Sequence, residues 1–306
     1  MAVGVDYGGT KIEAIVLDGA GAELARQRVA TPRHDYEGSL QAISELVLAV
    51  EAKAGVAPGP VGIGIPGAIG PDGRVFNGNS TWLIGNALGP DLTERLGRPV
   101  LVENDANCFV LSEAADGAAA GAGVVFGAIL GTGVGGAIVI DGKIVSGASG
   151  MAGEWGHSPL PIADPDTEFP GPACFCGRHG CIEKWLAGPG LEADYARDMG
   201  LTPGQGPRVP QIVEMAQAGD EGAEAALERH AARLARALAT VVNVLDPHVI
   251  VLGGGVSNLP GLADEMAERL RPIIYSTKSD LRVVRAMHGD SSGVRGAAKL
   301  AMGATA

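Results

Sequence analysis

Apolar positions along the chain follow two spacings, which predict short strands and longer helices. Runs of β-branched and other apolar residues, bounded by glycine or proline, predict strands. These runs lie within 3–17 and at 61–65, 100–102, 124–130, 137–140 and 249–252. Apolar residues spaced three or four positions apart predict helices at 36–53, 221–245 and 295–302, with a further helical run after 107. The mixture is typical of an α/β protein.

The first two strands form a predicted hairpin with a polar, glycine-rich tip, Asp6-Tyr7-Gly8-Gly9-Thr10-Lys11. The backbone amides of Gly8 and Gly9 can approach an anion, Thr10 offers a hydroxyl group, and Asp6 can reach a metal ion or its waters. An ordinary hairpin turn would have the same composition. The tip is therefore a candidate phosphate loop, which this motif alone does not separate from a plain turn.

A second glycine-rich tip, Gly131-Thr132-Gly133-Val134-Gly135-Gly136, follows the strand at 124–130. Its glycines match the G-x-G-x-x-G pattern of dinucleotide sites, but that pattern opens a helix. Here a second alternating strand follows, and Asp141 comes too early to be the acidic residue of such a site. Two similar hairpins about half the chain apart suggest an internal duplication, with both tips presented to an adenine nucleotide and its Mg²⁺.

Three further loops carry groups suited to a small ligand. Asn77, Asn79, Ser80, Thr81 and Trp82 form a polar lining with an aromatic ring, suited to a sugar but also to a solvated loop. Glu103-Asn104-Asp105-Ala106-Asn107 follows a strand, where ligands of open α/β sheets collect, although Asp105 would also serve as a helix N-cap. Gly253-Gly254-Gly255 suits contact with a purine or ribose, or a plain turn.

The stretch from Gly153 to Glu183 holds the densest set of potential ligands. The segment Gly153-Glu154-Trp155-Gly156-His157 precedes three cysteines, Cys174, Cys176 and Cys181. Three thiols and an imidazole match the Cys₃His set of structural zinc sites, although the C-x-C-x₄-C spacing is unusual. Unligated thiols or a disulfide on an irregular loop are the alternative. Because a long loop inside a domain needs an anchor, we expect a metal that also brings Glu154 and Glu183 together.

Composition and charge narrow the class of ligand. The chain of 306 residues is long enough for two domains, and 46% hydrophobic residues suffice for their cores. The formal net charge is −12, from 23 basic and 35 acidic residues with no basic run, which argues against nucleic acid or a membrane as partner. The N-terminus enters a strand without a signal peptide, so we expect a cytoplasmic protein, in which clustered cysteines favour metal over disulfide.

Taken together, these motifs resemble those of the ROK family of bacterial sugar kinases and repressors, from Met1 to the end of the chain. The order of Asp-x-Gly-Gly-Thr-Lys, Glu-Asn-Asp-Ala-Asn, Gly-Thr-Gly-x-Gly-Gly, Glu-x-Gly-His and Cys-x-Cys-Gly-x-x-Gly-Cys-x-Glu is far more specific than any single motif. No helix-turn-helix segment precedes the first strand, so we expect the kinase branch. The loops at 79–83, 153–161 and 288–293 look most like those of bacterial fructokinases (mannofructokinases), with N-acetylglucosamine kinases next.

The resemblance implies an actin-like, ribonuclease-H-like duplicated α/β fold with two domains around a cleft. Here the domains would be 1–117, joined by the C-terminal segment 288–306, and 118–287. The implied reaction transfers the γ-phosphoryl group of MgATP to a hexose hydroxyl. Fructose, and with it mannose, is the expected acceptor, with N-acetylglucosamine or glucose as alternatives. The resemblance also implies a structural Zn²⁺, Mg²⁺ bound with ATP, and a homodimer.

Carried over to this sequence, the resemblance assigns a role to each motif. Asp105 looks like the catalytic base. The sugar ligands would be Asn79, Asn104, Asp105, Glu154, His157 and Glu183. The nucleotide ligands would be Asp6, Gly8, Gly9, Thr10, Lys11, Gly131, Thr132, Gly133, Gly135, Gly136, Gly254 and Gly255. The zinc ligands would be His157, Cys174, Cys176 and Cys181.

Two other classes of protein remain as alternatives to a kinase. A sugar-responsive regulator would explain the sugar pocket but has no DNA-reading element in this sequence. A purely structural zinc module would explain only residues 157–181.

Overall fold

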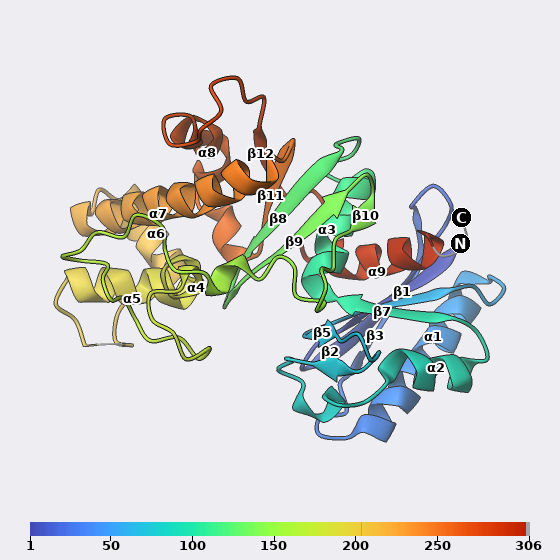
Figure 1. Ribbon diagram of the computed structural model, residues 1–306. Helices are drawn as coiled ribbons and strands as arrows, with labels where there is room; N and C mark the ends of the chain where they lie inside the picture. The colour runs from blue at the N-terminus through green and yellow to red at the C-terminus, as the bar shows by residue number, and fades with distance from the viewer. Residues whose placement is uncertain (203, 304–306) are drawn as a thin grey trace. The chain divides into compact units, whose positions relative to one another are not determined.

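The computed structural model describes residues 1–202 and 204–303 and divides the chain into two compact units (Figure 1). The first unit holds Met1–Gly123, Ala137–Ala152 and Met287–Ala306. The second unit holds Val124–Gly136 and Gly153–Ala286. Residues 304–306, the end of the predicted segment 288–306, lie outside the described part of the chain.

Five strands form the first sheet, in the order β3-β2-β1-β4-β7. Neighbours among β1, β2 and β3 pair antiparallel, whereas β1, β4 and β7 run parallel. The register aligns Asp6 with Gly64 and Gly64 with Glu103, so the carboxyl ends of the three parallel strands share one edge. The strands are β1 (Ala2–Tyr7), β2 (Lys11–Leu17), β3 (Glu23–Ala30), β4 (Val61–Ile65) and β7 (Val100–Asn104).

Helices cover both faces of the first sheet, because strand side chains alternate between the two faces. Val3 and Val5 of β1 pack into a core shared with α1 and α2, whereas Ile15 and Leu17 of β2 pack against α9. A short hairpin, β5 (Ala68–Ile69) and β6 (Val75–Phe76), belongs to the same unit. The helices are α1 (Tyr36–Ala54), α2 (Leu88–Leu96), α3 (Asp105–Asp116) and α9 (Ser292–Gly303).

Helix α9 approaches the sheet so closely that two strand positions have room only for glycine. A Cβ on Gly4 would lie 2.1 Å from the carbonyl oxygen of Val294, and one on Gly62 would lie 1.9 Å from that of Ala297. Backbone atoms cannot yield to such a contact as a flexible side chain could. Part of the high glycine content therefore serves helix-on-sheet packing rather than loops.

The second sheet has the order β10-β9-β8-β11-β12. Strands β8, β11 and β12 run parallel, and β10 pairs antiparallel with β9. The strands are β8 (Val124–Leu130), β9 (Val134–Ile140), β10 (Lys143–Ile144), β11 (Val249–Gly253) and β12 (Arg282–Arg285). The helices of the second unit are α4 (Ile182–Leu186), α5 (Gly188–Asp198), α6 (Val209–Gln217), α7 (Glu221–Leu245) and α8 (Leu262–Leu270).

Helix α7 is the long helix of the second unit, and it packs against α4, α5, α6 and α8. It begins where the Asp220 carboxylate accepts a hydrogen bond of 2.8 Å from the backbone N–H of Ala223. It ends at Asp246, which adopts a left-handed conformation just before Pro247. The predicted bounds 221–245 are those observed.

The two sheets repeat one plan: each has five strands, and the strand in the middle of the order, β1 or β8, begins a parallel run of three. The first hairpin, β1 and β2, corresponds in this plan to β8 and β9. This repeat confirms the predicted internal duplication. The second glycine-rich tip leads into strand β9 and not into a helix, so the dinucleotide interpretation is wrong.

The two compact units divide the chain differently from the predicted domains: residues 118–123, 137–152 and 287 belong to the first unit rather than to the second. The longest of these segments is 137–152. Within that unit β10 contacts α3, and Gly150 lies against the carbonyl oxygen of Ile69. These contacts hold the segment to the first unit, although it is close in sequence to the second. Across residues 1–202 and 204–303, no helix is both long and apolar enough to cross a membrane.

Candidate active site

The shared edge of the first sheet brings two predicted acidic residues to one place. Asp6 lies near the end of β1, and Asp105 directly follows β7. Since Asp6 aligns through Gly64 with Glu103, two strand spacings of about 5 Å separate the rows that carry the acids. Asp105 is exposed to solvent, as a base that receives a proton from a substrate must be.

The residue before Asp105 shapes the turn that presents it. Asn104 caps α3: its Oδ1 accepts hydrogen bonds from the backbone N–H groups of Ala106 at 2.9 Å and Asn107 at 3.2 Å. Its Nδ2 donates to the carbonyl oxygen of Gly67 at 2.8 Å. The interpretation of Asp105 as the N-cap is therefore wrong, because Asp105 is already the first helical residue. The amide oxygen of Asn104 is committed to the cap, and one of its two amide N–H groups is committed to Gly67.

Glu103 is a residue of this turn to which the sequence motifs assigned no role. Its Oε1 accepts hydrogen bonds from the backbone N–H of Asn104 at 2.8 Å and from Nδ2 of Asn107 at 2.9 Å. Its Oε2 lies 3.5 Å from the hydroxyl of Ser146. Glu103 thus braces the turn from within the first unit. The sequence signal that could have identified Glu103 is its carboxylate, which lies two residues before the candidate catalytic carboxylate.

At the tip of the first hairpin, one of the two backbone amides predicted to approach an anion is used within the turn itself. The N–H of Gly8 donates to the carbonyl oxygen of Lys11 at 2.9 Å and closes the turn, so it does not face a phosphate. No atom lies within 4 Å of a Cβ position on Gly9, so the backbone is open to close approach there. Burial raises the pKa of Asp6 from 3.8 to about 6; the charge of Glu13 adds to the rise and that of Lys11 opposes it.

In the loop at 77–83, Asn79 is exposed to solvent, whereas the indole ring of Trp82 packs inward. Trp82 donates a hydrogen bond of 2.8 Å from Nε1 to the hydroxyl of Tyr7, and its ring packs against the core under the sheet. His34 contacts the ring edge-on, with 5.1 Å between centroids. Trp82 thus stabilises the loop from inside, and the expected stacking of this ring on a sugar is not supported.

The second unit brings the four predicted zinc ligands together. Their ligand atoms all lie within 4.8 Å of one another. Cys174 Sγ is 3.6 Å from Nδ1 of His157, and Cys176 Sγ is 3.6 Å from Cys181 Sγ. Thiolates bound tetrahedrally at about 2.3 Å from zinc would be separated by roughly 3.8 Å, so this donor set fits the ion. A disulfide would need a sulfur separation of about 2.05 Å, and all four cysteines are free.

The ligand thiols differ in their electrostatics. A backbone hydrogen bond from Arg178 lowers the pKa of Cys176 to about 6. Burial raises the pKa of Cys181 to about 12, because the thiolate would lose its hydration and face the neighbouring sulfurs. Cys176 therefore loses its proton more readily than Cys181. A bound cation would be needed to favour the thiolate of Cys181.

A buried ion-pair network gives the candidate zinc-binding loop, residues 153–183, a second anchor that the motifs did not reveal. Arg233 of α7 donates to Glu168 at 2.8 Å and pairs with Asp194 at 2.9 Å, while its guanidinium lies 4.6 Å from the ring centroid of Trp185. Burial raises the pKa of Glu168, but hydrogen bonds from Arg236 and its other partners outweigh this and lower the pKa to about 2. The loop is thus tied to α7 independently of metal.

Two acidic residues flank the zinc ligands. Glu183 Oε2 accepts a hydrogen bond of 3.1 Å from the backbone N–H of Val134, which joins the zinc-binding loop to the second glycine-rich tip. Burial raises the pKa of Glu154; the charge of His157 opposes this rise and that of Glu183 adds to it. Glu154 is therefore near enough to His157 and Glu183 for both charges to act on it.

A cavity of about 480 Å³ within the second unit joins two of the predicted nucleotide motifs. It also contains residues that sequence reasoning missed, among them Glu192, which accepts a hydrogen bond of 2.7 Å from Arg208. Gly254 has φ +78, and its Cβ would lie 2.4 Å from the Leu130 carbonyl oxygen, so a neighbouring backbone explains this glycine. The lining residues are Gly131, Thr132, Gly188, Pro189, Glu192, Arg208, Val209, Pro210, Gly255 and Val256.

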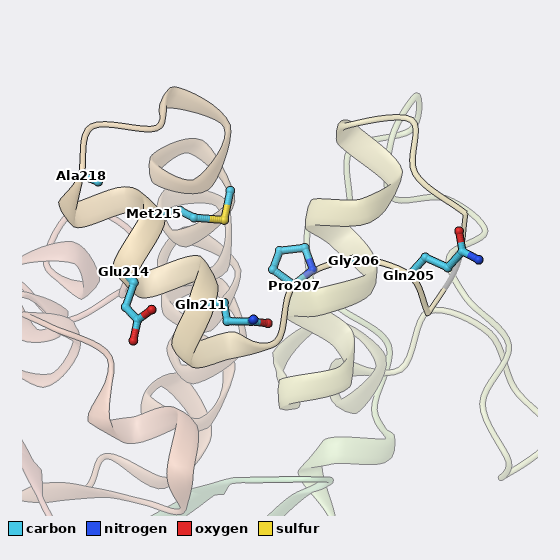
Figure 2. A pocket seen from close by; sticks show the side chains of 7 residues that line it. All are labelled: Gln205, Gly206, Pro207, Gln211, Glu214, Met215 and Ala218. Carbon is cyan, nitrogen blue, oxygen red and sulfur yellow. The ribbon is translucent and has the colours of Figure 1, made fainter.

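A second cavity, of about 560 Å³, lies beside α6 and is separate from these motifs (Figure 2). Figure 2 shows side chains of α6, such as Met215, on one side and the preceding segment with Pro207 on the other. Among the described residues that line it, none is a predicted ligand. Its lining residues are Gln205, Gly206, Pro207, Gln211, Glu214, Met215 and Ala218.

The duplicated fold, the two glycine-threonine tips and the carboxylate after β7 define a sugar kinase of the actin-like ATPase class. The chain belongs to the ROK family, whose sequence profile matches residues 2–304.

Comparison with known proteins gives the following similarities. The N-acetyl-D-glucosamine kinases of Shigella flexneri and of Escherichia coli O1:K1 are each 41% identical over 305 residues, which cover 98% of this chain and 99% of each relative. The structure of the ROK hexokinase of Thermus thermophilus matches with a TM-score of 0.86 and 34% identity, covering 99% of this chain and 98% of that one. The ROK glucokinase of Streptomyces griseus, solved with glucose and AMPPNP, matches with a TM-score of 0.77 and 32% identity, covering 99% of both chains.

Proposed function

We propose that this protein transfers the γ-phosphoryl group of MgATP to N-acetylglucosamine. The observation that carries the proposal is the 41% identity to N-acetyl-D-glucosamine kinases over 98% of the chain. The two solved structures at 32% and 34% identity are of a glucokinase and a hexokinase, which supports a hexose as acceptor. The fructose expected from the loop motifs becomes the second candidate.

Asp105 would act as the general base that takes the proton of the attacking hydroxyl. Phosphoryl transfer depends mainly on positioning and on neutralising the charge of the phosphates, so the base needs a defined place more than a high pKa. The cap formed by Asn104 and the bonds to Glu103 supply that place. Mg²⁺ bound with ATP would neutralise phosphate charge, and Asp6, on the same edge of the sheet, is the carboxylate suited to its waters.

Glu154, His157 and Glu183 would hydrogen-bond the hydroxyl groups of the sugar, together with Asn79 and Asn104. A site built from polar groups rejects sugars that leave those groups unpaired, so these residues would determine selectivity. Bound zinc would hold His157 through Nδ1, the atom that faces Cys174, and leave its other nitrogen for the sugar. The bond from Val134 to Glu183 supports a further role, since it links the sugar ligands to a phosphate loop.

The cavity of about 480 Å³ would hold the adenosine part of ATP. Its size suits a nucleoside, and it lies against Gly131 and Thr132 of the second tip and against Gly255 after β11. Glu192 and Arg208 are its charged lining residues, placed to meet ribose hydroxyl groups or the base.

A coupled ATP-consumption assay with N-acetylglucosamine, fructose, mannose and glucose tests the proposal. We expect the highest kcat/KM with N-acetylglucosamine, by at least about tenfold, because a missing polar contact in a matched site is costly. A clear preference for fructose would instead support the second candidate. Turnover with none of the four hexoses would favour a sugar-responsive regulator, which equilibrium binding of the same sugars would then test.

A further inference from the structure

A buried chain of hydrogen bonds joins the first hairpin to the loop at 77–83. Trp82 Nε1 lies 2.8 Å from the hydroxyl of Tyr7, which lies 2.8 Å from Oγ of Ser39. Ser39 in turn donates to the carbonyl oxygen of Asp35 at 2.7 Å. An indole N–H only donates, and Ser39 uses its single hydrogen on Asp35, so the Tyr7 hydroxyl accepts from Trp82 and donates to Ser39. Each hydroxyl in the chain therefore both donates and accepts a hydrogen bond.

The two ends of this chain lie next to predicted ligand residues. Tyr7 stands between Asp6 and Gly8 at the tip of the first hairpin, and its side chain is fully buried, so it does not touch a substrate itself. Trp82 follows the exposed Asn79 by three residues, in the short 3-10 helix Thr81–Leu83. Leu83, also fully buried, is the apolar anchor of the same loop. The Tyr7 hydroxyl is its polar anchor.

We propose that Tyr7 is a positioning residue that sets the sugar-contacting loop at 77–83 relative to the phosphate hairpin at 6–11. The proposal rests on the function proposed above, because that function makes Asn79 a sugar ligand. Burial of Leu83 keeps the loop against the core but does not fix its orientation, because apolar contacts are not directional. The bond from Trp82 to Tyr7 adds direction, and therefore fixes where Asn79 points.

Substitution Tyr7→Phe keeps the ring in the core and removes only the hydroxyl. The N–H of Trp82 then lacks its acceptor, and the loop shifts to satisfy it. We expect KM for N-acetylglucosamine to rise about 5- to 20-fold, with KM for ATP within about twofold of the native value. A purely structural role would lower the amount of folded enzyme, and with it the apparent kcat, and would leave both KM values unchanged.

A double-mutant cycle identifies the bond that acts. Trp82→Phe breaks the same bond from the other side and should also raise the sugar KM. In that background Tyr7→Phe should add no further rise, because the interaction is already absent. Tyr36→Phe is the matched control: it removes a hydroxyl that bonds Asp91 elsewhere in the first unit and should leave both constants unchanged. Additive effects of Tyr7→Phe and Trp82→Phe would overturn the inference.

Hydrogen exchange tests the contact without any substrate. Tyr7→Phe should speed exchange of the amides in 77–83 relative to Tyr36→Phe, while exchange in helix α7 of the second unit stays the same. Unchanged exchange at 77–83 would overturn the inference even in an active kinase. Absence of sugar turnover by the native protein would overturn the proposed function and not the exchange result, so the two failures are distinguishable.

Discussion

At the scale of single residues, the structure separates what Asn104 and Asp105 do. The motif places both at the end of a strand, and either has the chemistry of a helix cap. Asn104 caps α3 with its amide oxygen and binds the carbonyl oxygen of Gly67 with its amide nitrogen. Asp105 is thereby held at the first position of the helix with its carboxylate exposed. A structural residue thus precedes the candidate base and orients it.

Replacing Asp105 by Asn should slow turnover by roughly 10²–10⁴-fold while nucleotide affinity is largely kept. The amide retains the shape of the side chain but does not take a proton from the sugar hydroxyl. Steady-state kinetics and nucleotide titration measure the two effects separately. Asp72→Asn, at an exposed turn, serves as the control. Near-native turnover of Asp105→Asn would remove Asp105 from the role of base.

Replacing Asp6 by Asn should stabilise the protein while weakening MgATP binding. Folding raises the pKa of Asp6 from 3.8 to about 6, so the native state binds this proton more tightly than the unfolded chain. Its contribution to stability therefore falls as pH rises through this window. At pH 7 we expect Asp6→Asn to gain about 1–3 kcal/mol in the free energy of unfolding.

Denaturant unfolding at several pH values checks this prediction for Asp6. The gain from Asp6→Asn should disappear below about pH 3, where the carboxyl group of Asp6 is protonated in both the folded and the unfolded state. A gain that does not depend on pH would contradict an origin in the buried charge. Lost MgATP affinity together with higher stability would show that Asp6 is retained for function at the expense of stability.

At the scale of elements, the candidate zinc-binding loop connects the four candidate zinc ligands with the second glycine-rich tip and with helix α7. It carries His157 and the three cysteines, and Glu183 at its end accepts a hydrogen bond from Val134 of the second glycine-rich tip. Ion pairs of Glu168 with Arg233 and Arg236 attach the loop to α7 as well. Removing a metal should therefore disturb the ligand end of the loop more than its attachment to α7.

Chelation of zinc should abolish sugar binding before it affects nucleotide binding. His157 and Glu183 would lose their places, whereas the cavity beside Gly255 does not contain a zinc ligand. Calorimetric titration of both ligands before and after metal removal, with released zinc quantified, measures this. Cys174→Ser should behave like the chelated protein, and Cys108→Ala, at a buried thiol outside the cluster, should retain zinc. A metal-free protein with native sugar affinity would contradict the prediction.

At the scale of the whole molecule, one strand plan occurs twice, and the first and last described elements of the chain pack together in the first unit. Helix α9, which contains the last described residues, packs against β1 and β4 near the beginning of the sequence. Gly4 and Gly62 permit that contact. Part of one face of the first sheet is therefore covered only when the C-terminal helix is in place.

Gly62→Ala should destabilise the protein by about 1–3 kcal/mol or more, because a methyl group would overlap the carbonyl oxygen of Ala297. Thermal unfolding measures the loss. Gly19→Ala is the matched control, since nothing lies within 4 Å of the added atom there. Equal unfolding temperatures for the two variants would show that α9 does not pack as closely as described.

Strongly patterned elements could be predicted from the sequence, and edge elements could not. Strands β4 and β8 and helix α7 have the predicted bounds, because buried runs and long apolar stripes are unambiguous. The pattern missed β3 and β12, with sequences ELARQRVA and RVVR. Both are edge strands, whose exposed positions carry charged residues and interrupt the apolar run.

The sequence by itself determined the chemistry of this protein: two glycine-threonine tips, a carboxylate after a strand, and a Cys₃His set. These signals are local, since each is carried by residue types within a few positions. Only the tertiary structure decided how each polar group is used. The Gly8 amide closes a turn, Trp82 donates to Tyr7, and Val134 donates to Glu183. The physical reason is that a polar group has several possible partners, near and distant in sequence, and folding decides which of them lies within hydrogen-bonding distance.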